Sequence, residues 1–406
     1  MLRQALEKIK KIREIAKKYS QYTAECLSEM VKIPSLSAGE EQVVLKIKEQ
    51  LETAGVKDVR IDGLGNLIAR VGNGPKILAF DAHIDTVDTG DVDQWDTPPF
   101  SGLIKNGYVH GRGTVDQEGG AAAMVTAARI LTEQDYDGDY SIYFTFTVME
   151  EDCDGMCWLY LIEEEKLVPD FAVITEPTNL GLYRGHRGRM EMEVHITGLS
   201  AHGSAPERGK NVIYSGAKTA LAIQQLHKEL KNDEFLGKGS IAPTVLTTET
   251  PSLCAIPDKA FMHIDRRLTW GETKESAVTE VQHIIGDDSK VVVPIYARES
   301  YRGNIFKQEK YFPTWKIPED HPLVQAGVKT HMGLFDEAPR IDKWTFSTNG
   351  VAICGKHKIP CIGFGPGNEI YAHAPNEKVP VEHLEKASAF YAALPYILED
   401  KQITDR

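Results

Sequence analysis

Acidic residues and histidines stand directly after several short apolar runs of this sequence, and two more lie close to glycine-rich turns. Apolar runs of this length are typical of strands in the interior of a parallel sheet. Side chains beyond the carboxyl ends of such strands converge in one crevice, where imidazole and carboxylate groups suit one or two divalent ions. Zinc is the first expectation, with cobalt or manganese as alternatives. The residues in these positions are His83, Asp85, Asp116, Glu150, Glu151, Glu176 and His373.

Two neighbouring glutamates, Glu150 and Glu151, follow the apolar segment 141–149 directly. In an extended segment, the side chains of successive residues point to opposite sides of the backbone. If the strand continues through this pair, one carboxylate faces a metal ion and the other faces the reacting water. We therefore expect the pair to combine metal binding with proton transfer.

Other interpretations of single motifs are weaker than this combined one. A lone histidine is most often structural, but here two of them fall among the same acidic positions. The glycine-rich turn that begins at Gly111 lacks the third glycine of a dinucleotide-binding loop. Cys153 and Cys157 have a spacing that zinc could use, but no second pair of Cys or His lies near them, which favours ordinary helix packing.

The elements that must position these groups alternate between strands and helices over much of the chain. Helical periodicity is followed by short β-rich runs and then by a helix of small residues. Such alternation predicts an α/β fold with a mixed, mostly parallel sheet flanked by helices. The expected helices are 4–33, 40–54, 119–131 and 381–398, and the expected strands are 59–61, 67–71, 76–82, 141–149, 171–175 and 361–364.

The pattern changes between about residues 180 and 299. Elements there follow the order βαββαβ, which is the order of a ferredoxin-like α+β domain. We predict that residues 181–297 form an inserted lid or dimerisation domain, and that 1–180 and 298–406 form the catalytic, metal-binding domain. The expected elements are strands 190–197, 241–248, 260–268 and 290–297 and helices 211–230 and 274–285.

The charge balance of the chain disfavours some partners. Lys and Arg number 46 against 59 Asp and Glu, which gives a net charge of −13 and makes nucleic acid a poor partner. No apolar stretch approaches the roughly 18 residues of a membrane span, and the N-terminus has no apolar core of a signal peptide. A cytoplasmic protein with reduced cysteines is the expectation.

Five short motifs follow one another along the chain. They are His83-Ile-Asp85-Thr-Val, Gly111-Arg-Gly-x-x-Asp116, Glu150-Glu151, Thr175-Glu176-Pro-Thr178, and Gly365-Pro-Gly367 followed by His373-x-Pro-x-Glu377. In this order they resemble the motifs of a dinuclear zinc amidohydrolase and peptidase family, which includes acetylornithine deacetylase, succinyl-diaminopimelate desuccinylase and glutamate carboxypeptidase. The resemblance extends from about residue 33 to residue 398. The segment Asp116-Gln-Glu-Gly-Gly is similar to a branch described as selenium-metabolism-linked hydrolases.

The resemblance implies a zinc-peptidase-like catalytic domain and a role for each of these residues. Glu150 would be the general base for attack by a metal-bridging water, and Asp85 would orient His83 through its second ring nitrogen. The peptide bond after Asp116 would be cis. The implied ligands of the two ions are Asp116 as the bridge, His83 and Glu176 at one ion, and Glu151 and His373 at the other.

The resemblance also implies substrate contacts outside the metal ligands. His202, in the lid motif of the inserted domain, would stabilise the oxyanion and would often come from the partner subunit, so a homodimer through this domain is expected. Arg267 would bind the substrate carboxylate with its planar guanidinium, and Asn349 would also contact substrate. The family usually has Asp at position 349, an Asn at the position of Cys254 and a Lys at the position of Glu118. The known specificities therefore do not transfer to this chain.

Three functions are compatible with these residues. The leading one is hydrolysis of an amide bond in a small carboxylate-bearing substrate, by an N-acyl amino acid deacylase or an exopeptidase or dipeptidase. The second is removal of an N-carbamoyl group by a ureidohydrolase. The third is a catalytically inactive, metal-dependent binding protein, in which Glu118 and Cys254 mark lost chemistry. The presence of Glu150 argues against the third, because a general base has little use without a water to activate.

Overall fold

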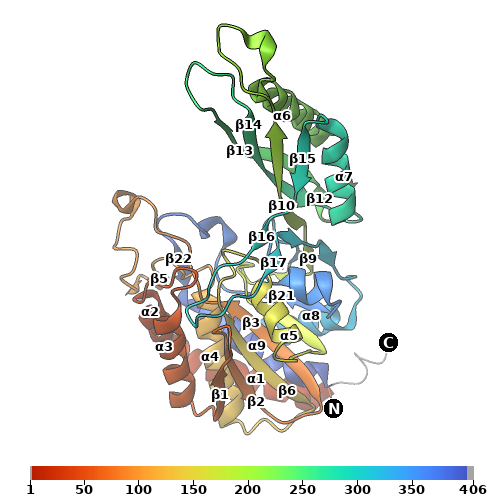
Figure 1. Cartoon of the computed structure of the whole chain (residues 1–406). Helices are drawn as coiled ribbons and strands as arrows, with labels where there is room; N and C mark the ends of the chain where they lie inside the picture. Colours follow the sequence, from red (N-terminus) through yellow and green to blue (C-terminus); the bar gives the residue numbers. More distant parts are fainter. Residues whose placement is uncertain (1, 400–406) are drawn as a thin grey trace.

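A computed structural model describes residues 2–399 of the chain, with side chains from residue 7 onward. Its larger sheet has eight strands in the order β1-β2-β6-β3-β7-β21-β8-β20 (Figure 1). The central strands β6, β3, β7 and β21 run parallel, whereas β1 and β2 form an antiparallel edge. The predicted mixed, mostly parallel sheet is confirmed. Its strands are β1 (Asp58–Ile61), β2 (Leu67–Val71), β3 (Lys76–His83), β6 (Tyr140–Thr147), β7 (Phe171–Ile174), β8 (Leu182–Tyr183), β20 (Ile341–Asp342) and β21 (Cys361–Gly363).

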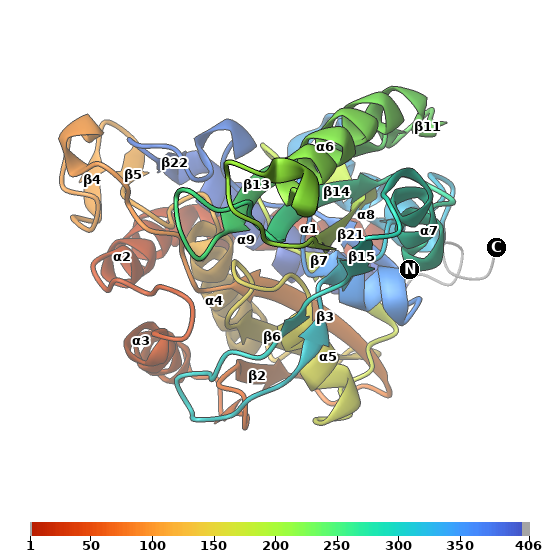
Figure 2. The same ribbon diagram turned by 45° about the horizontal axis from the view of Figure 1, so that its top comes forward.

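Helices cover both faces of this sheet (Figures 1 and 2). One layer is built around α4 and α9, which pack on each other and contact α1, α2 and α8. On the other face lie α5 and the π-helical turn η3 (Val351–Lys356), which pack together. The helices of the two layers are α1 (Leu2–Lys18), α2 (Ser20–Val31), α3 (Glu41–Thr53), α4 (Glu118–Glu133), α5 (Met156–Glu163), α8 (Pro322–Phe335) and α9 (Val381–Leu398).

The first predicted helix, 4–33, is two helices in the structure. The chain turns at Tyr19, whose φ of −92° and ψ of 6° interrupt the helix. The Tyr19 hydroxyl donates to Glu133 of α4 at 2.8 Å, so the break is fixed by a tertiary contact. It lets α1 pack along α9 while α2 packs on α4.

The small residues at the start of α4 let this helix approach the sheet closely. A Cβ on Gly120 would lie 2.2 Å from the Thr175 hydroxyl oxygen and 2.8 Å from its carbonyl oxygen. Only glycine therefore allows this contact between α4 and the end of β7. The tight packing predicted for the helix is confirmed, and it lies next to Glu176.

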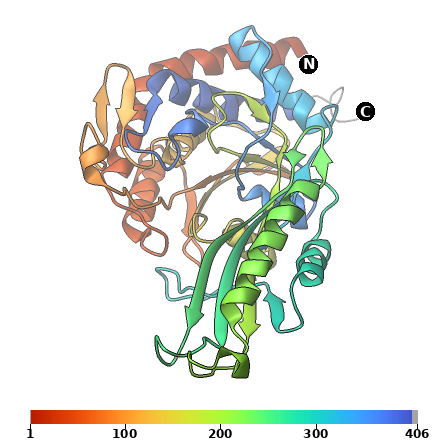
Figure 3. The ribbon, with the colours of Figure 1, turned by 90° about the horizontal axis from the view of Figure 1, so that it is seen from above.

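A smaller sheet has the order β13-β14-β10-β15, with β18 also paired to β10. Its helices α6 and α7 cover one face, and Figure 3 shows α6 lying along the strands. The βαββαβ order and this strand order confirm the ferredoxin-like prediction. Its apolar cluster is separate from that of the larger sheet. The elements are β10 (Gly188–Thr197), α6 (Val212–Glu229), β13 (Ser240–Glu249), β14 (Lys259–Leu268), α7 (Lys274–Ile284), β15 (Ser289–Val292) and β18 (Tyr311–Phe312).

Short elements connect the two sheets and brace the loops. The strand β8 belongs to the larger sheet, so the chain enters the smaller one only at β10. A three-stranded sheet, β22-β5-β4, joins the segments 103–110 and 378–380. In the part of the chain that is described, no helix is both long and apolar enough to cross a membrane. The short elements are η1 (Val92–Gln94), β4 (Leu103–Lys105), β5 (Tyr108–His110), β9 (Gly185–His186), η2 (Pro206–Arg208), β11 (Asn232–Asp233), β12 (Gly237–Lys238), β16 (Ile295–Tyr296), β17 (Gln308–Glu309), β19 (Trp315–Lys316), η4 (Glu369–Tyr371) and β22 (Lys378–Pro380).

Candidate metal centre

The predicted ligands meet at the carboxyl ends of three adjacent parallel strands. In the register of the sheet His83 is opposite Thr147, and Asp81 is opposite Ile174, so β3, β6 and β7 end side by side. His83 is the last residue of β3, and the glutamates follow the other two strands. The structure brings together the five predicted ligands, His83, Asp116, Glu151, Glu176 and His373, and with them Glu150, the predicted general base.

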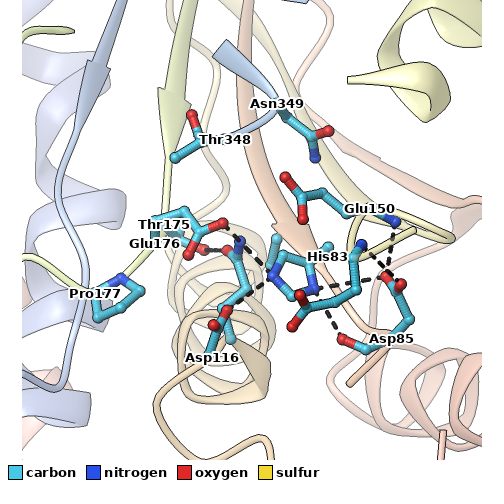
Figure 4. Close-up of polar contacts among 12 residues, drawn as sticks. His83, Asp85, Asp116, Glu150, Thr175, Glu176, Pro177, Thr348 and Asn349 are labelled. Carbon is cyan, nitrogen blue, oxygen red and sulfur yellow. Dashed lines mark hydrogen bonds and ion pairs between the residues drawn. The ribbon is translucent and has the colours of Figure 1, made fainter. Parts of the chain in front are cut away.

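His83 is completely buried, with its two ring nitrogens in different surroundings. Its Nδ1 lies 2.9 Å from the backbone carbonyl oxygen of Asp85, and its Nε2 lies 2.9 Å from Asp116 Oδ1 and 3.5 Å from Glu176 Oε1. Figure 4 shows the ring with Asp85 on one side and Asp116 and Glu176 on the other. A proton on Nδ1 that bonds the carbonyl leaves the lone pair of Nε2 facing the carboxylates, as a metal ligand requires.

The Asp116 carboxylate lies between the two histidines. Its Oδ2 is 3.2 Å from His373 Nε2, which is also 3.1 Å from Glu151 Oε1. Burial of Asp116 opposes its ionisation, but its contacts with His373 and His83 hold the pKa below its usual value. The same contacts with Asp116 and Glu151 raise the pKa of His373 to about 10. One oxygen of Asp116 thus serves each imidazole, which is the arrangement of a bridging carboxylate.

The carboxylates of Glu150, Glu151 and Glu176 lie close together and have few hydrogen-bond donors around them. Burial and neighbouring negative charges raise the pKa of Glu150 and Glu176 well above the usual value, and that of Glu151 to about 7. Glu150 Oε1 and Glu176 Oε2 accept no hydrogen bond. Crowded, desolvated carboxylates are stabilised by bound cations.

Two groups of three residues could each hold a metal ion, because the possible ligand atoms within each group all lie within 4.8 Å of one another. One group is His83, Glu150 and Glu176, and the other is His83, Asp116 and Glu151. Imidazole nitrogens and carboxylate oxygens are ligands of zinc and similar divalent ions. The donor set therefore fits such ions.

The prediction that Glu150 and Glu151 lie on an extended segment is wrong. The strand β6 ends at Thr147, and Met149 has a φ of 61°, so the glutamates lie in a turn. The turn forms because the Asp85 carboxylate accepts the backbone N–H groups of both glutamates, each at 3.0 Å. Both side chains face the cluster from this turn.

Two residues that hold this turn were missed by the sequence reasoning. Ser37 donates to Asp85 Oδ2 at 2.6 Å, and Glu40 accepts the backbone N–H of Met149 at 3.0 Å. Glu40 precedes a helix, so in the sequence it has the ordinary appearance of an acidic residue at a helix start. Asp85 contacts His83 Nδ1 through its backbone carbonyl oxygen. Its carboxylate lies 3.6 Å from that nitrogen and accepts hydrogen bonds from the turn instead.

Comparison with known proteins agrees with this geometry. The sequence profile of peptidase family M20/M25/M40 matches residues 79–396. The chain belongs to this family. It is 48% identical over 389 residues to the uncharacterized protein YgeY of Escherichia coli K12, covering 95% of this chain and 96% of that protein. It is 31% identical over 376 residues to a probable succinyl-diaminopimelate desuccinylase of Staphylococcus epidermidis, covering 86% and 91%.

A solved structure shares the fold of this M20 chain. The Bacillus subtilis YXEP protein, described as a dinuclear metal-binding peptidase of the M20 family, superposes with a TM-score of 0.69 at 15% identity, covering 94% of this chain and 98% of that one. The M20 family comprises metal-dependent hydrolases of amide and peptide bonds. This chain is accordingly a hydrolase of that kind, with the ligand groups of a metal centre in place.

Two further predictions can be checked directly. The peptide bond between Asp116 and Gln117 is cis, as the resemblance to the family implies. The sequence around Cys153 and Cys157 favours helix packing over a zinc site; both are buried, and Cys157, in α5, lies 3.1 Å from the Asn349 amide oxygen. Within the described residues neither cysteine belongs to a ligand group, which agrees with helix packing.

Asn349 lies next to the candidate metal centre, against β3, and is almost completely buried. Its Nδ2 donates to Asp81 Oδ2 at 2.8 Å, and its Oδ1 accepts the backbone N–H of Gly155 at 2.9 Å. Figure 4 places its amide beyond Glu150 from His83. Because both ends of the amide are engaged, these contacts favour a positioning role over the substrate contact expected from the sequence.

His202 and Arg267 are not brought into the cluster within one chain. His202 is exposed and lies beyond the last residue of β10; its ring Nδ1 lies 2.7 Å from the Ser204 hydroxyl, and its backbone forms an isolated bridge with Ala255. The ten residues of β10 lead away from the larger sheet over about 33 Å, at about 3.3 Å per residue (Figure 1). Arg267 lies at the opposite end of the smaller sheet, where both of its bonds, of 2.9 and 3.2 Å, go to Asp265.

Proposed function

We propose that this chain hydrolyses the amide bond of a small, carboxylate-bearing N-acyl amino acid or short peptide, using two divalent ions, most readily Zn²⁺. One observation carries the proposal: the Asp116 carboxylate lies between His83 and His373 with Glu150 close by. A bridging carboxylate with one imidazole on each side is the simplest protein frame for a pair of ions.

The contacts support one proposed set of ligands. Asp116 would be shared by the two ions, His83 and Glu176 would hold one, and Glu151 and His373 would hold the other. When bound, two such ions lower the pKa of a shared water from about 15.7 towards 7 and polarise a substrate carbonyl. The protein must then supply a proton acceptor and a donor to the developing oxyanion.

Glu150 is the proposed proton acceptor. Its Oε1 has no hydrogen-bond partner, and its backbone is fixed by Asp85. A carboxylate held in this way can take a proton from the attacking water and pass it to the leaving amine. Its side chain lies within the group formed with His83 and Glu176, close to where the reacting atoms would be.

The oxyanion donor is proposed to be His202 of a second copy of the chain. The strand β13 forms an edge of the smaller sheet, and most of its residues are exposed. On the adjacent α6, Ile213, Tyr214 and Leu221 are between 48 and 69% exposed. An open strand edge beside exposed apolar side chains favours pairing with an identical edge in a homodimer. Such a pairing would supply the centre with a histidine that its own chain leaves distant.

Arg267 is proposed to bind the substrate carboxylate. Its guanidinium is already held in a two-bond contact with Asp265, and it is partly exposed. A substrate carboxylate would offer the same planar acceptor pair. We further propose a cytoplasmic location, a catalytic domain of residues 1–180 and 298–406, and a lid of residues 181–297.

The reaction class can be tested with a panel of N-acyl amino acids, N-carbamoyl amino acids and dipeptides. Protein loaded with Zn²⁺, Co²⁺ or Mn²⁺ would be incubated with each compound and the products identified by mass spectrometry. Release of a carboxylic acid or an amino acid is expected. Release of ammonia and carbon dioxide would instead identify a ureidohydrolase, and silence across the panel would favour a binding protein.

A further inference from the structure

Glu377 is a fully buried carboxylate with no ligand role in the proposed centre. All of its side-chain bonds go to one segment of chain. Its Oε1 accepts the backbone N–H groups of Val115, at 2.7 Å, and Asp116, at 3.1 Å. Its Oε2 accepts the N–H of Gly113, at 3.2 Å, and a bond from the Arg112 guanidinium, at 2.7 Å.

The segment 111–116 needs such an acceptor. Gly111 and Gly113 have φ values of 141° and 88°, so the chain turns through conformations that a helix or strand does not use. Buried backbone N–H groups in such a turn need acceptors from elsewhere in the molecule. Glu377 supplies an acceptor for three of them, including the N–H of Asp116 itself.

The same residue belongs to the loop that carries His373. That loop is also irregular, with positive φ at His373 and Asn376. The Arg112 guanidinium donates to the carbonyl oxygen of Ala374 at 3.3 Å, and the carbonyl oxygen of Glu377 accepts the N–H of Gly111 at 3.0 Å. Just beyond, β22 pairs with β5. The two loops are therefore tied together along their length.

We propose that Glu377 is a positioning residue that fixes Asp116 and His373 relative to each other, and thereby sets the geometry of the ion that they share. The inference rests on the proposed two-metal function. A carboxylate suits this task because it is an acceptor only, whereas an amide would turn its NH₂ group towards a backbone N–H. Loss of a residue that orients metal ligands typically weakens metal binding about 10–100-fold.

The test compares Glu377→Gln with the matched variant Glu272→Gln. Glu272 is also buried, also accepts a backbone N–H and also pairs with an arginine, with bonds of 2.6 Å from Thr269 and Arg266, but it lies in the smaller sheet's domain. Affinities for Co²⁺ and Zn²⁺ would be measured by chelator competition, and the ligand geometry by the visible absorption of bound Co²⁺. We expect Glu377→Gln to lower the affinity for one of the two ions about 10–100-fold and to change the absorption spectrum of bound Co²⁺. Glu272→Gln should keep the wild-type affinities and spectrum.

Wild-type affinity and spectrum in Glu377→Gln would overturn the inference. If that variant does not fold, Arg112→Gln keeps the acceptor of the three N–H groups and removes the guanidinium bonds to Glu377 and Ala374. Arg112→Gln should lower the affinity for the same ion by a smaller factor, and an unchanged affinity would again overturn the inference. A wild-type chain that binds no divalent ion would overturn both this inference and the proposed function. A chain that binds two ions but hydrolyses nothing would overturn only the proposed function.

Discussion

At the scale of single residues, the two neighbouring glutamates share one turn but are expected to do different work. Glu150 Oε1 is free of hydrogen bonds, whereas Glu151 Oε1 contacts His373. We expect Glu150→Gln to keep both metal ions and lose about 10²–10⁴-fold in kcat, because only the proton acceptor is removed. Elemental analysis and steady-state kinetics on the same preparations measure the two effects.

The matched variant is Glu151→Gln, which should lose one ion as well as activity. Both substitutions keep the size of the side chain, so a difference in metal content reports ligation alone. If Glu150→Gln loses an ion and Glu151→Gln does not, the roles of the two residues are exchanged. Near wild-type turnover in Glu150→Gln would contradict the general-base assignment.

His186 predicts how the stability of the fold depends on pH. Its Nε2 accepts a bond of 2.7 Å from the Trp315 indole, and its Nδ1 lies 2.8 Å from the carbonyl oxygen of Arg187. Burial lowers the pKa of this histidine to about 4, while Asp154 favours and Arg267 disfavours its protonation. The neutral ring is therefore the folded form, since a proton on Nε2 would displace the indole.

Because the pKa of His186 is lower in the folded chain than the ordinary value of about 6.5, the unfolded chain binds the proton more readily. The stability associated with this residue is complete above pH 6.5 and is lost as the pH falls from 6.5 towards 4. The loss is on the order of 3 kcal/mol at the low end. Urea unfolding at several pH values should show a smaller decline in His186→Gln than in the wild type. Equal declines would contradict the assignment.

At the scale of elements, the approach of α4 to β7 depends on Gly120. A Cβ there would lie 2.2 Å from the Thr175 hydroxyl, so Gly120→Ala should destabilise the fold by about 1–3 kcal/mol. Gly216 in α6 is the matched control, because its Cβ would meet the far end of the flexible Leu246 side chain, at 3.2 Å, and Ile196 only at an ordinary contact distance of 3.8 Å. Gly216→Ala should be neutral or stabilising by up to about 1 kcal/mol. Denaturant midpoints measure both, and equal effects would contradict the close packing.

Elements also separate what the sequence can predict from what it cannot. Short apolar runs followed by His83, Glu150 or Glu176 predict both the parallel strands and the edge of the sheet at which the ligands meet. The break at Tyr19 could not be predicted, because apolar periodicity continues through it, and the side chains that hold Tyr19 there, Glu133 and Arg129, belong to a distant helix. The turn at Glu150 was missed for the same reason, since its acceptor, Asp85, is 65 residues away.

Buried acceptors that serve another loop are the least predictable part of the centre. Glu40 lies 109 residues from Met149, and Glu377 lies 262 residues from Val115, whose backbone N–H groups they accept. Glu40 looks like any acidic residue at a helix start, and the motif that contains Glu377 does not show which backbone groups its carboxylate binds. Metal ligands are easier to recognise, because each one stands next to an apolar strand or a glycine-rich turn.

At the scale of the whole molecule, the two sheets are joined by ion pairs and a hydrogen bond next to the turn that carries Glu150 and Glu151. Asp152 accepts bonds from Arg298, at 2.6 Å, and from the Tyr296 hydroxyl, at 2.8 Å, on the return from the smaller sheet. Asp154 accepts a bond of 2.7 Å from Arg189, at the start of β10. The orientation of the smaller sheet is therefore set within a few residues of Glu150, although His202 lies at its far end.

This arrangement predicts complementation between two inactive variants if His202 is supplied by a second copy of the chain. In a heterodimer of Glu150→Gln with His202→Ala, one site combines the intact Glu150 of one chain with the intact His202 of the other. Random mixing then gives about a quarter of wild-type activity, because half of the dimers are mixed and each has one working site. Activity would be measured after co-refolding or co-expression, with mass measurement of the dimer. If His202 instead reached its own site by closure of the smaller sheet, one chain of the mixed dimer would lack Glu150 and the other His202. The mixture would then stay inactive, so the absence of recovery in a proven heterodimer would reject the exchange of His202 between copies.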